Sequence, residues 1–454
     1  MNKQPETHFL KALFSRLKQF GVQYAVMRNY QSLPLTVNGS DLDILIKPGC
    51  EAVAKSALMR AVEDANGAVI GIAATEGFFK FNAFGRPSEY SNAWWGLRID
   101  VSVGLKFRGC ANLLSESVLQ ERIIYHHGIP VLPPDLAAII GVLKEVLYNG
   151  LIDHRYLPDA ISAIQGNREQ VFQDLAPMGH SAIHELIILC RKSENQSLSP
   201  KTISRIRKRL LYHAFRTSPL GFLKSRLKFS YSKVQRIFHP PGIVIAFLGT
   251  DGSGKSTLIK AITPTLESAT HGDLFIRHLR PKLLPPLSQL KSQTIDSSTA
   301  VMEPQKDPPS GVLGSLVRIS YLSADYILGY WISIRPIISR SPAVQIFDRY
   351  AYDLLIDQRR LKINLPRWIV RSFLAGVPRP DLTICLSGDP HAIYERKKEL
   401  SITEVSRQIN ELNKFANTTM NTVLIFTDRS IGEAKTAILE AILKTCNQRG
   451  NPLI

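Results

Sequence analysis

The sequence predicts an α/β protein with two domains: an α+β domain at the N-terminus and a doubly wound parallel sheet at the C-terminus. Its 454 residues exceed what one hydrophobic core usually serves, so at least two domains are expected. In residues 241–454, apolar runs rich in β-branched residues alternate with helical stretches, which is typical of an α/β domain. Near the N-terminus, an amphipathic helix precedes strand-like segments that carry aspartates among apolar residues.

The distribution of charge divides the chain further. The net charge is +18, and residues 197–242 hold eleven Lys or Arg and no Asp or Glu. Pro240 and Pro241 close this basic stretch immediately before an apolar run, which favours a domain boundary there. We therefore expect an N-terminal domain with trailing helices over residues 1–195, a basic connector over 196–240 and a C-terminal domain over 241–454.

The basic connector interleaves its positive charges with Leu, Phe and Tyr. Three interpretations stay open: a solvated linker helix, a segment that lies on an anionic membrane surface and, least favoured, a segment that binds nucleic acid. A second biased stretch, Pro281–Gly311, is rich in Pro, Ser and Gln. We expect it to form a mobile loop within the C-terminal domain.

The cysteines and the apolar runs bear on cellular location. The five cysteines lie far apart without a CxxC pair, which argues against a zinc ribbon or a disulfide framework and fits a reducing compartment. The N-terminus shows no signal-peptide pattern, and no apolar run reaches the roughly 18 residues of a membrane span. We expect a cytoplasmic protein, peripheral at the inner membrane face if the connector binds lipid. The sequence leaves the oligomeric state open, a dimer included.

The clearest chemical motif is the glycine-rich stretch "GTDGSGKST" between an apolar strand and a helix. This order predicts a phosphate-binding P-loop, because glycines let backbone N–H groups converge on phosphate oxygens at a helix N-terminus. Lys255 can reach the β- and γ-phosphates of a nucleotide, and the Ser256 hydroxyl can bind Mg²⁺. The residues predicted to bind the nucleotide are Gly249, Gly252, Ser253, Gly254, Lys255, Ser256 and Thr257.

Further charged residues follow later strands of the same domain. Asp348 and Arg349 stand near the end of the apolar run over 343–350, where open α/β sheets bind ligands. There Asp348 can organise Mg²⁺ and Arg349 can face an acceptor phosphate, although such a pair also occurs as a structural ion pair. Arg396 lies on a basic helical stretch that either closes over the phosphates as a lid or forms a solvated helix face.

Four segments, "FLGTDGSGKST", "FDRY", "PDLTICL" and "ERKKEL", occur in the order and approximate spacing of the thymidylate kinase family. The chain resembles that family over most of residues 241–454. The resemblance implies a five-stranded parallel sheet, ATP, Mg²⁺ and phosphoryl transfer to a monophosphate. It implies that Lys255, Ser256 and Thr257 hold ATP and metal. It also implies that Asp251 faces the acceptor, that Arg349 binds the acceptor phosphate and that Arg396 belongs to the lid.

The part that would read the nucleoside departs from this family. In place of a "TREPGGT"-like stretch the chain has "IRHLRPKLLPPL", and "AYDLLIDQRR" stands where members usually show a Ser and an Ala-Tyr-Gln. We infer that the acceptor is a small phosphorylated metabolite other than thymidylate. The segments "FDRYAYDLLIDQRR", "HLRP" and "SADYILGYW" look like a divergent subfamily often found beside bacterial surface-polysaccharide genes. That resemblance implies a role in polysaccharide biosynthesis.

Two strand-like segments of the N-terminal part carry three aspartates. In "SDLDILIK", Asp41 and Asp43 point to one side of a strand, and Asp100 in "LRIDVSV" lies on a later strand. Three carboxylates that meet on neighbouring strands suit a Mg²⁺ site for nucleotidyl transfer, and surface aspartates on an edge strand are the alternative. The order of elements is a helix, a strand, the strand with "DLD" and a later strand with "IDV". This order resembles the DNA polymerase β-like nucleotidyltransferase superfamily over about residues 8–150.

This second resemblance is incomplete. Active members carry a Gly-Ser turn upstream of the acidic pair, and here Arg28 and Asn29 take that place, while Gly39-Ser40 abuts Asp41. The N-terminal domain is therefore either a second enzyme or a degenerate binding module. For the whole chain we expect a P-loop kinase. The alternatives are a nucleotidyltransferase with the kinase as a partner activity, and a nucleotide-gated regulator at the membrane surface.

Overall fold

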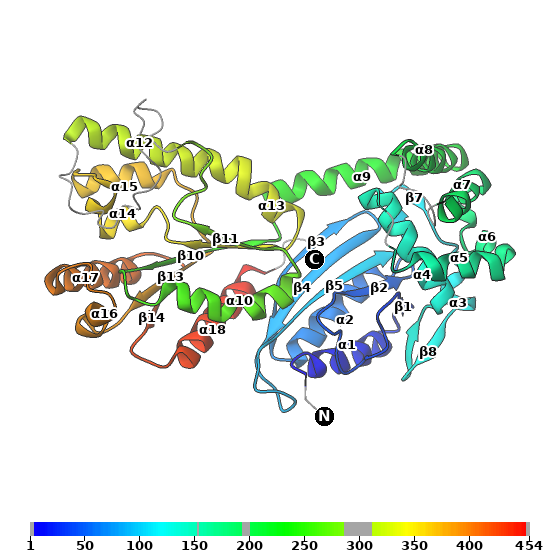
Figure 1. Cartoon of the computed structure of the whole chain (residues 1–454), viewed down its shortest axis with the longest axis horizontal. Coiled ribbons are helices and arrows are strands. Elements are labelled where there is room, and N and C mark those ends of the chain that lie inside the picture. The colour runs from blue at the N-terminus through cyan, green and yellow to red at the C-terminus, as the bar shows by residue number, and fades with distance from the viewer. Residues whose placement is uncertain (1–3, 152–153, 193–199, 286–310, 451–454) are drawn as a thin grey trace. The chain divides into compact units, whose positions relative to one another are not determined.

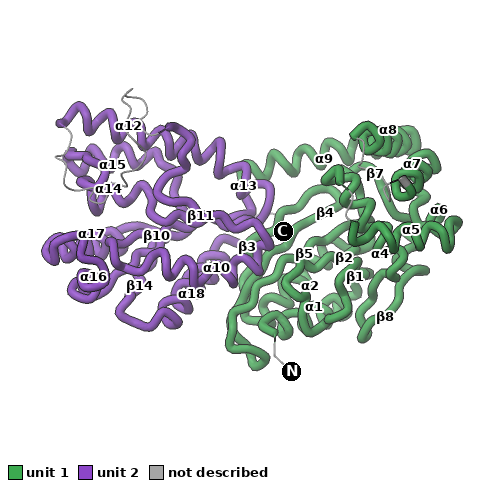
Figure 2. Tube along the Cα trace, in the orientation of Figure 1, with its two compact units in different colours: residues 1–238, 451–454 green, residues 239–450 purple. Residues whose placement is uncertain are grey.

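The computed structural model describes residues 4–151, 154–192, 200–285 and 311–450. The chain forms two compact units, Met1–Phe238 and His239–Gly450, which Figure 2 colours separately. Most of the loop predicted over Pro281–Gly311, residues 286–310, lies outside the described residues. None of the helices in the described residues is long and apolar enough to cross a lipid bilayer.

The first unit is built on a mixed sheet of seven strands in the order β3-β4-β5-β2-β1-β9-β8 (Figure 1). These strands are β1 (Tyr24–Val26), β2 (Leu42–Ile46), β3 (Gly67–Thr75), β4 (Phe78–Gly85), β5 (Trp95–Val103), β8 (Ile124–His126) and β9 (Ile129–Val131). β2 and β5 are parallel neighbours, and their register sets Asp43 opposite Asp100. The two acidic strands predicted from the sequence therefore lie side by side.

Two helices, α1 (Thr7–Gln19) and α2 (Glu51–Asp64), share one hydrophobic core with this sheet. The apolar residues Leu42, Ile44 and Ile46 of β2 belong to that core, so Asp43 and Leu45 face away from α1 and α2. The amphipathic helix predicted at the N-terminus is confirmed as α1, whose apolar residues Phe9, Leu10, Leu13, Phe14 and Leu17 are buried. Phe20 follows the end of the helix, and its side chain is 36% exposed.

Helices from the later part of the first unit form a second core with Leu45. The remaining elements of this unit are β6 (Lys106–Phe107), β7 (Ala111–Asn112), α3 (Val118–Glu121), α4 (Pro134–Lys144), the π-helical turn η1 (Glu145–Asn149), α5 (Leu157–Gly166), α6 (Arg168–Asp174), the 3₁₀ turn η2 (Ala176–Met178) and α7 (His180–Lys192). The basic stretch itself forms α8 (Pro200–Thr217) and α9 (Pro219–Phe238), both in the first unit. Ile203, Ile206 and Leu210 of α8 are buried in the second core.

The second unit has a five-stranded sheet in the order β11-β12-β10-β13-β14, and every neighbouring pair is parallel. Its strands are β10 (Ile243–Gly249), β11 (Leu274–His278), β12 (Val344–Asp348), β13 (Leu382–Ser387) and β14 (Thr422–Phe426). They alternate with helices, as the apolar runs in residues 241–454 predicted. β10, the first of these strands along the chain, lies in the centre of the sheet. The strands that follow it are added first on one side and then on the other. In open α/β sheets a ligand crevice lies at the carboxyl end of the strands where this change of side occurs.

Helices cover both faces of this sheet, as predicted for a doubly wound fold (Figure 1). α12 (Val312–Gly329), α13 (Arg335–Arg340), α15 (Arg367–Ala375) and α17 (Ile402–Thr418) share a core with Val244, Ala246 and Leu248 of β10. On the other face, α10 (Lys255–Thr270) packs against α18 (Ile431–Arg449). The other elements are the π-helical turn η3 (Tyr330–Ile334), α14 (Asp353–Ile356), the 3₁₀ turn η4 (Arg359–Leu361) and α16 (Pro390–Arg396).

Candidate functional site

The glycine-rich loop joins the carboxyl end of the central strand β10 to the N-terminus of α10. All seven residues of β10 are buried, so the loop starts from a rigid position in the sheet. Gly252 and Gly254 have φ angles of 85° and 84°, a left-handed conformation that other residues adopt only with strain. A Cβ at Gly252 would lie 2.7 Å from the carbonyl oxygen of Ile393. The loop therefore needs glycine both for its curvature and for its close packing against α16.

Lys255, the first residue of α10, is buried with its charge directed into this loop. Its Nζ donates hydrogen bonds to the carbonyl oxygens of Gly249 at 2.9 Å and Thr250 at 2.7 Å. Burial, followed by the positive charge of Arg349, lowers the pKa of Lys255 to about 8. A buried cation has already lost most of its bound water. Its electrostatic attraction to an incoming phosphate is therefore strong, because little further desolvation opposes binding.

Ser256 and Asp348 lie together beside the loop and offer oxygen ligands. The Ser256 hydroxyl donates to Oδ2 of Asp348 at 3.4 Å, and Nδ1 of His278 lies 3.6 Å from the same oxygen. Oδ1 of Asp348 is buried and has no hydrogen-bond partner among the described residues. A hydroxyl and a carboxylate oxygen without a partner are the donors that Mg²⁺ prefers. The residues present therefore fit the metal that the sequence predicted at Ser256 and Asp348.

Arg349 is held in a strained conformation directly after β12. Its φ of 78° lies in the left-handed region, which arginine rarely adopts. Its guanidinium is only 6% exposed; it forms an ion pair with Asp251 and donates to Oδ2 of Asp353 at 2.9 Å. The sequence predicted that Arg349 binds an acceptor phosphate. In this structure two carboxylates engage the guanidinium, and they fix its position beside the loop.

Asp251, within the loop, links two arginines. Besides Arg349, its carboxylate accepts a hydrogen bond from Arg360 of η4 at 2.8 Å. Burial by itself would raise the pKa of Asp251, but the charges of Arg349 and Arg360 outweigh it and lower the pKa to about 2. Asp251 therefore stays ionised at neutral pH and holds both arginines beside the glycine-rich loop.

Replacing Asp251 by Asn is expected to lower the free energy of unfolding of the second unit by about 2 kcal/mol at pH 7, because the fold then loses the attraction of Arg349 and Arg360 for the ionised carboxylate. The folded-state pKa is lower than that of the unfolded chain, so this contribution is present above pH ~4 and is lost as pH falls toward 2. Calorimetry from pH 7 to pH 3 should show the two proteins converging. Glu395→Gln, which removes an exposed carboxylate, is the matched control. Equal stability of Asp251→Asn and wild type at pH 7 would contradict the ion-pair network.

Arg396, the predicted lid residue, ends α16. Its guanidinium donates to the carbonyl oxygen of Thr427, just after β14, at 3.1 Å. The neighbouring cations Lys397 and Lys398 are exposed and pair with Glu399 and Glu395. The structure thus places Arg396 beside the carboxyl end of β14, at the same edge of the sheet as the loop.

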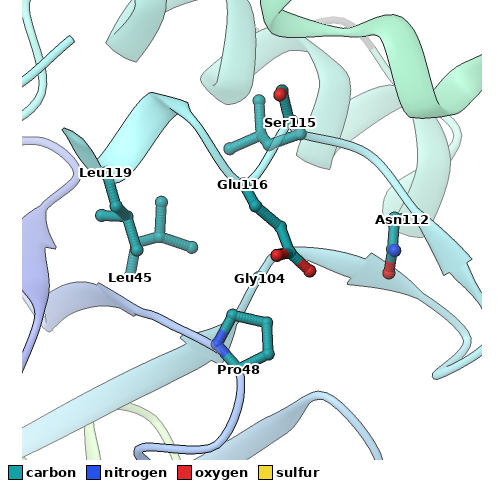
Figure 3. Close-up of a pocket in the computed structure, with 8 residues that line it drawn as sticks. Leu45, Pro48, Gly104, Asn112, Ser115, Glu116 and Leu119 are labelled. Carbon is teal, nitrogen blue, oxygen red and sulfur yellow. The ribbon is translucent and has the colours of Figure 1, made fainter. Parts of the chain in front are cut away.

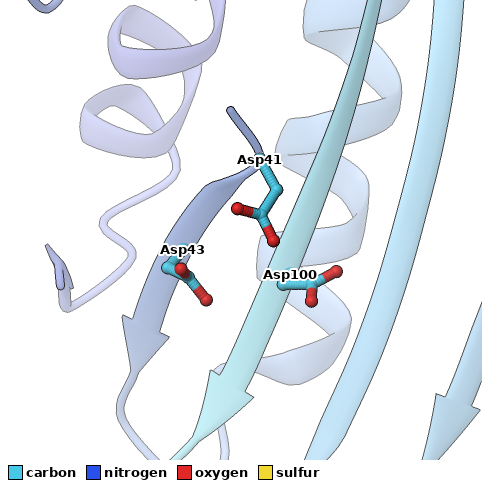
Figure 4. Close-up of side chains that lie close together, drawn as sticks. All are labelled: Asp41, Asp43 and Asp100. Carbon is cyan, nitrogen blue, oxygen red and sulfur yellow. The ribbon is translucent and has the colours of Figure 1, made fainter. Parts of the chain in front are cut away.

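The three aspartates of the first unit also come together, as predicted (Figure 4). Asp41, Asp43 and Asp100 each offer a carboxylate oxygen, and these atoms lie within 4.8 Å of one another. Asp43 is 1% exposed. Three carboxylates this close would repel one another strongly unless positive charge lies among them.

Positive charge is supplied by the chain itself. Lys144 of α4 binds Oδ1 of Asp43 at 2.7 Å, and Arg28 forms an ion pair with Oδ2 of the same residue. An Arg98 nitrogen lies 2.9 Å from Oδ1 of Asp100. Burial by itself would raise the pKa of Asp43, but Lys144 and Arg28 outweigh it and lower the pKa. Among the described residues, Lys144, Arg28 and Arg98 thus contact the carboxylate oxygens of Asp43 and Asp100 that a divalent metal would otherwise bind.

Several of these partners were missed by the sequence analysis. Asp353 lies four residues after Arg349, a spacing that can indicate an ion pair on one helical turn. Arg360 is in the quoted "AYDLLIDQRR", but the motif did not show which residue it meets. Lys144 left no local signal, because Asp43 is 101 positions away in the chain.

A small pocket in the first unit lies between β2, the residues after β5, and α3 (Figure 3). Its lining includes Leu45, Pro48, Glu116 and Leu119. Its volume of about 20 Å³ has room for roughly one water molecule, so it is too small for a nucleotide.

Comparison with known proteins gives a limited result. No protein-family model and no curated protein matches the sequence. Among solved structures, thymidylate kinase from Candida albicans has a TM-score of 0.32 and 19% identity, covering 45% of this chain and 93% of its own. Thymidylate kinase from Ehrlichia chaffeensis has a TM-score of 0.29 and 17% identity, covering 44% of this chain and 100% of its own. The site of the second unit is therefore described from its own strand order and glycine-rich loop.

Proposed function

We propose that the second unit is an ATP-dependent phosphotransferase that transfers the γ-phosphoryl group to a small phosphorylated acceptor. The observation that carries this proposal is the position of Lys255. Its buried ammonium lies in a complete P-loop at the centre of a parallel sheet, beside the Ser256–Asp348 oxygen pair. This arrangement supplies what phosphoryl transfer requires, which is fixed positive charge and a metal position at the phosphates.

Each residue of the site has a distinct part in the proposed reaction. The N–H groups of the loop and Nζ of Lys255 hold the phosphate oxygens of ATP. Ser256 and Asp348 would hold Mg²⁺, which neutralises phosphate charge when bound. Arg349 and Asp353 fix one another behind the loop. Asp251 holds Arg349 and Arg360 in place by ion pairs, and through them it shapes the part of the site that we assign to the acceptor.

Arg360 is the residue we assign to the acceptor phosphate. Its side chain is 26% exposed, whereas that of Arg349 is 6% exposed and held by two carboxylates. An arginine that is oriented by one carboxylate and still reaches solvent can bind a phosphate without breaking a buried ion pair. This assignment differs from the one that the family resemblance implied for Arg349.

Replacing Arg360 by Met is expected to raise the KM for the acceptor about 10- to 100-fold, since a charged hydrogen bond contributes about 1.5–3 kcal/mol. The KM for ATP should stay unchanged, because Arg360 contacts the loop through the Asp251 carboxylate and not through Lys255 or Ser256. Steady-state kinetics with each substrate varied in turn measure the difference. Arg359→Met, at the preceding position of the same turn, is the matched control. A raised KM for ATP with an unchanged KM for the acceptor would contradict the assignment.

The proposed reaction is tested by incubating the purified full chain with a metabolite extract and ATP labelled at the γ-phosphate. Transfer of label to one compound, dependent on Mg²⁺ and lost in Lys255→Met, supports the phosphotransferase. Sugar phosphates and nucleoside monophosphates are the first pure acceptors to try, because the sequence resemblance implied surface-polysaccharide biosynthesis. Tight ATP binding without any stimulated acceptor would instead favour a nucleotide-gated regulator.

A further inference from the structure

We infer that the outward face of α9 is a docking surface for anionic lipid. Five apolar residues, Leu220, Leu223, Leu227, Tyr231 and Val234, recur on this helix at intervals of three or four. This spacing places them in a single stripe along a helix of 20 residues, roughly 30 Å in length. Each is between 50% and 84% exposed. An apolar stripe of this length is unusual on a protein surface and marks an interaction site.

The opposite side of α9 faces its own unit. Phe229 and Arg236 lie about half a turn away from the stripe. The ring of Phe229 packs against Gly109, and Arg236 is buried. Phe222 and Ser225, also away from the stripe, line a cavity of about 280 Å³ that Lys106, Cys110 and His213 share. The orientation of α9 is therefore fixed by packing within the first unit, and that packing leaves the apolar stripe at the surface.

Positive charges lie beside the stripe. Lys224 and Lys228 follow one of its edges, and both are exposed. Toward the other edge, Arg226 lies beside the Cys110 thiol and Lys233 lies over the ring of Phe229. Neither α9 nor α8 contains an Asp or a Glu. Lysine and arginine beside an apolar stripe can extend their charged ends toward phosphate groups while their aliphatic stems lie along the lipid. The pattern is that of a helix lying in the plane of a membrane surface.

The positive charge of α9, together with its apolar stripe, favours an anionic lipid surface over a second copy of the chain or nucleic acid. A second copy of α9 would bring like charges together beside the stripe, since the helix has no acidic residue to pair with them. Nucleic acid would satisfy the lysines and arginines, but its phosphates would leave the Leu and Val side chains without an apolar partner. An anionic bilayer satisfies both features, because it combines a negative surface with an acyl layer beneath it.

The surface is tested with the full chain and vesicles of phosphatidylcholine, with and without 30% phosphatidylglycerol. Wild type should sediment with the anionic vesicles and should be released by 0.5 M salt. The double variant Leu223→Glu/Leu227→Glu should lose at least about tenfold in binding, while ATP turnover stays unchanged. The matched control is Leu35→Glu/Ile124→Glu, which adds the same charge at two exposed apolar residues elsewhere in the first unit. It should bind like wild type.

A second variant keeps the proposal testable if the double variant fails to fold. Tyr231→Trp should show a blue-shifted fluorescence increment on addition of anionic vesicles, because the indole enters the apolar layer. No shift, or equal vesicle binding by wild type and a folded double variant, would overturn the inference. Retention of duplex RNA without retention of vesicles would overturn it in favour of nucleic acid. A concentration-dependent dimer that the double variant abolishes, again without vesicle binding, would do so in favour of a second copy.

Discussion

Lys255→Met is expected to abolish phosphoryl transfer from ATP, with kcat falling by at least about 10³-fold, or about 4 kcal/mol of transition-state stabilisation. The reason is geometric. Lys255 is fixed by the carbonyl oxygens of Gly249 and Thr250 at the loop where phosphates are expected, and methionine preserves its length but not its charge. Turnover of γ-labelled ATP with a saturating acceptor measures the loss.

The same substitution should leave the fold intact. Lys255 is 7% exposed, and burial disfavours its charged form, so a neutral side chain of similar length should not lower the melting temperature. The pair of results separates a catalytic role from a structural one. Lys260→Met, on the exposed side of the same helix, is the control for loss of a lysine from α10. If Lys255→Met retained more than about a tenth of wild-type turnover, phosphoryl transfer at this loop would be ruled out.

Lys144→Met is expected to destabilise the first unit by about 3–5 kcal/mol, the cost of leaving a buried carboxylate without a partner. Asp43 is 1% exposed and has Lys144 as one of its two cation partners, at 2.7 Å. The change should appear as a lower midpoint of the urea unfolding transition. Because the cluster has then lost the cation that contacts Oδ1 of Asp43, millimolar Mg²⁺ should restore part of the lost stability, whereas it should not stabilise wild type.

The double variant Asp43→Asn/Lys144→Met tests the cause. It removes the charge of both partners, so its stability should lie well above that of Lys144→Met and should not respond to Mg²⁺. Wild type that binds Mg²⁺ at this cluster, with pyrophosphate release lost in Asp43→Asn, would show instead that the internal cations give way to metal. That result would support the nucleotidyltransferase interpretation of the first unit.

The elements near both sites could be predicted because their signals are local. β10 is a continuous apolar run followed at once by "GTDGSGKST", and every part of the P-loop lies within a few residues. The alternation in "SDLDILIK" likewise fixes which side of β2 carries Asp43, whatever that strand meets. Even the apolar stripe of α9 is visible as a spacing in the sequence.

Partners brought together by the fold could not be predicted in this way. Lys144 and Asp43 are 101 positions apart, and Arg360 and Asp251 are 109 positions apart. An ion pair between such residues leaves no periodic pattern in either segment. Whether Asp41, Asp43 and Asp100 bind metal or cations of the chain depends on where Arg28, Arg98 and Lys144 are placed by the helices and strands that carry them.

The sequence by itself determined the parallel sheet, the phosphate loop and the presence of three aspartates on two strands, because strand periodicity and turn chemistry act over short stretches. Only the tertiary structure decided how these groups are charged. It buried Arg349 between two carboxylates, left Arg360 toward solvent and matched the aspartate cluster with internal cations. Electrostatic balance is a sum over neighbours in space, and neighbours in space are fixed only when distant segments pack.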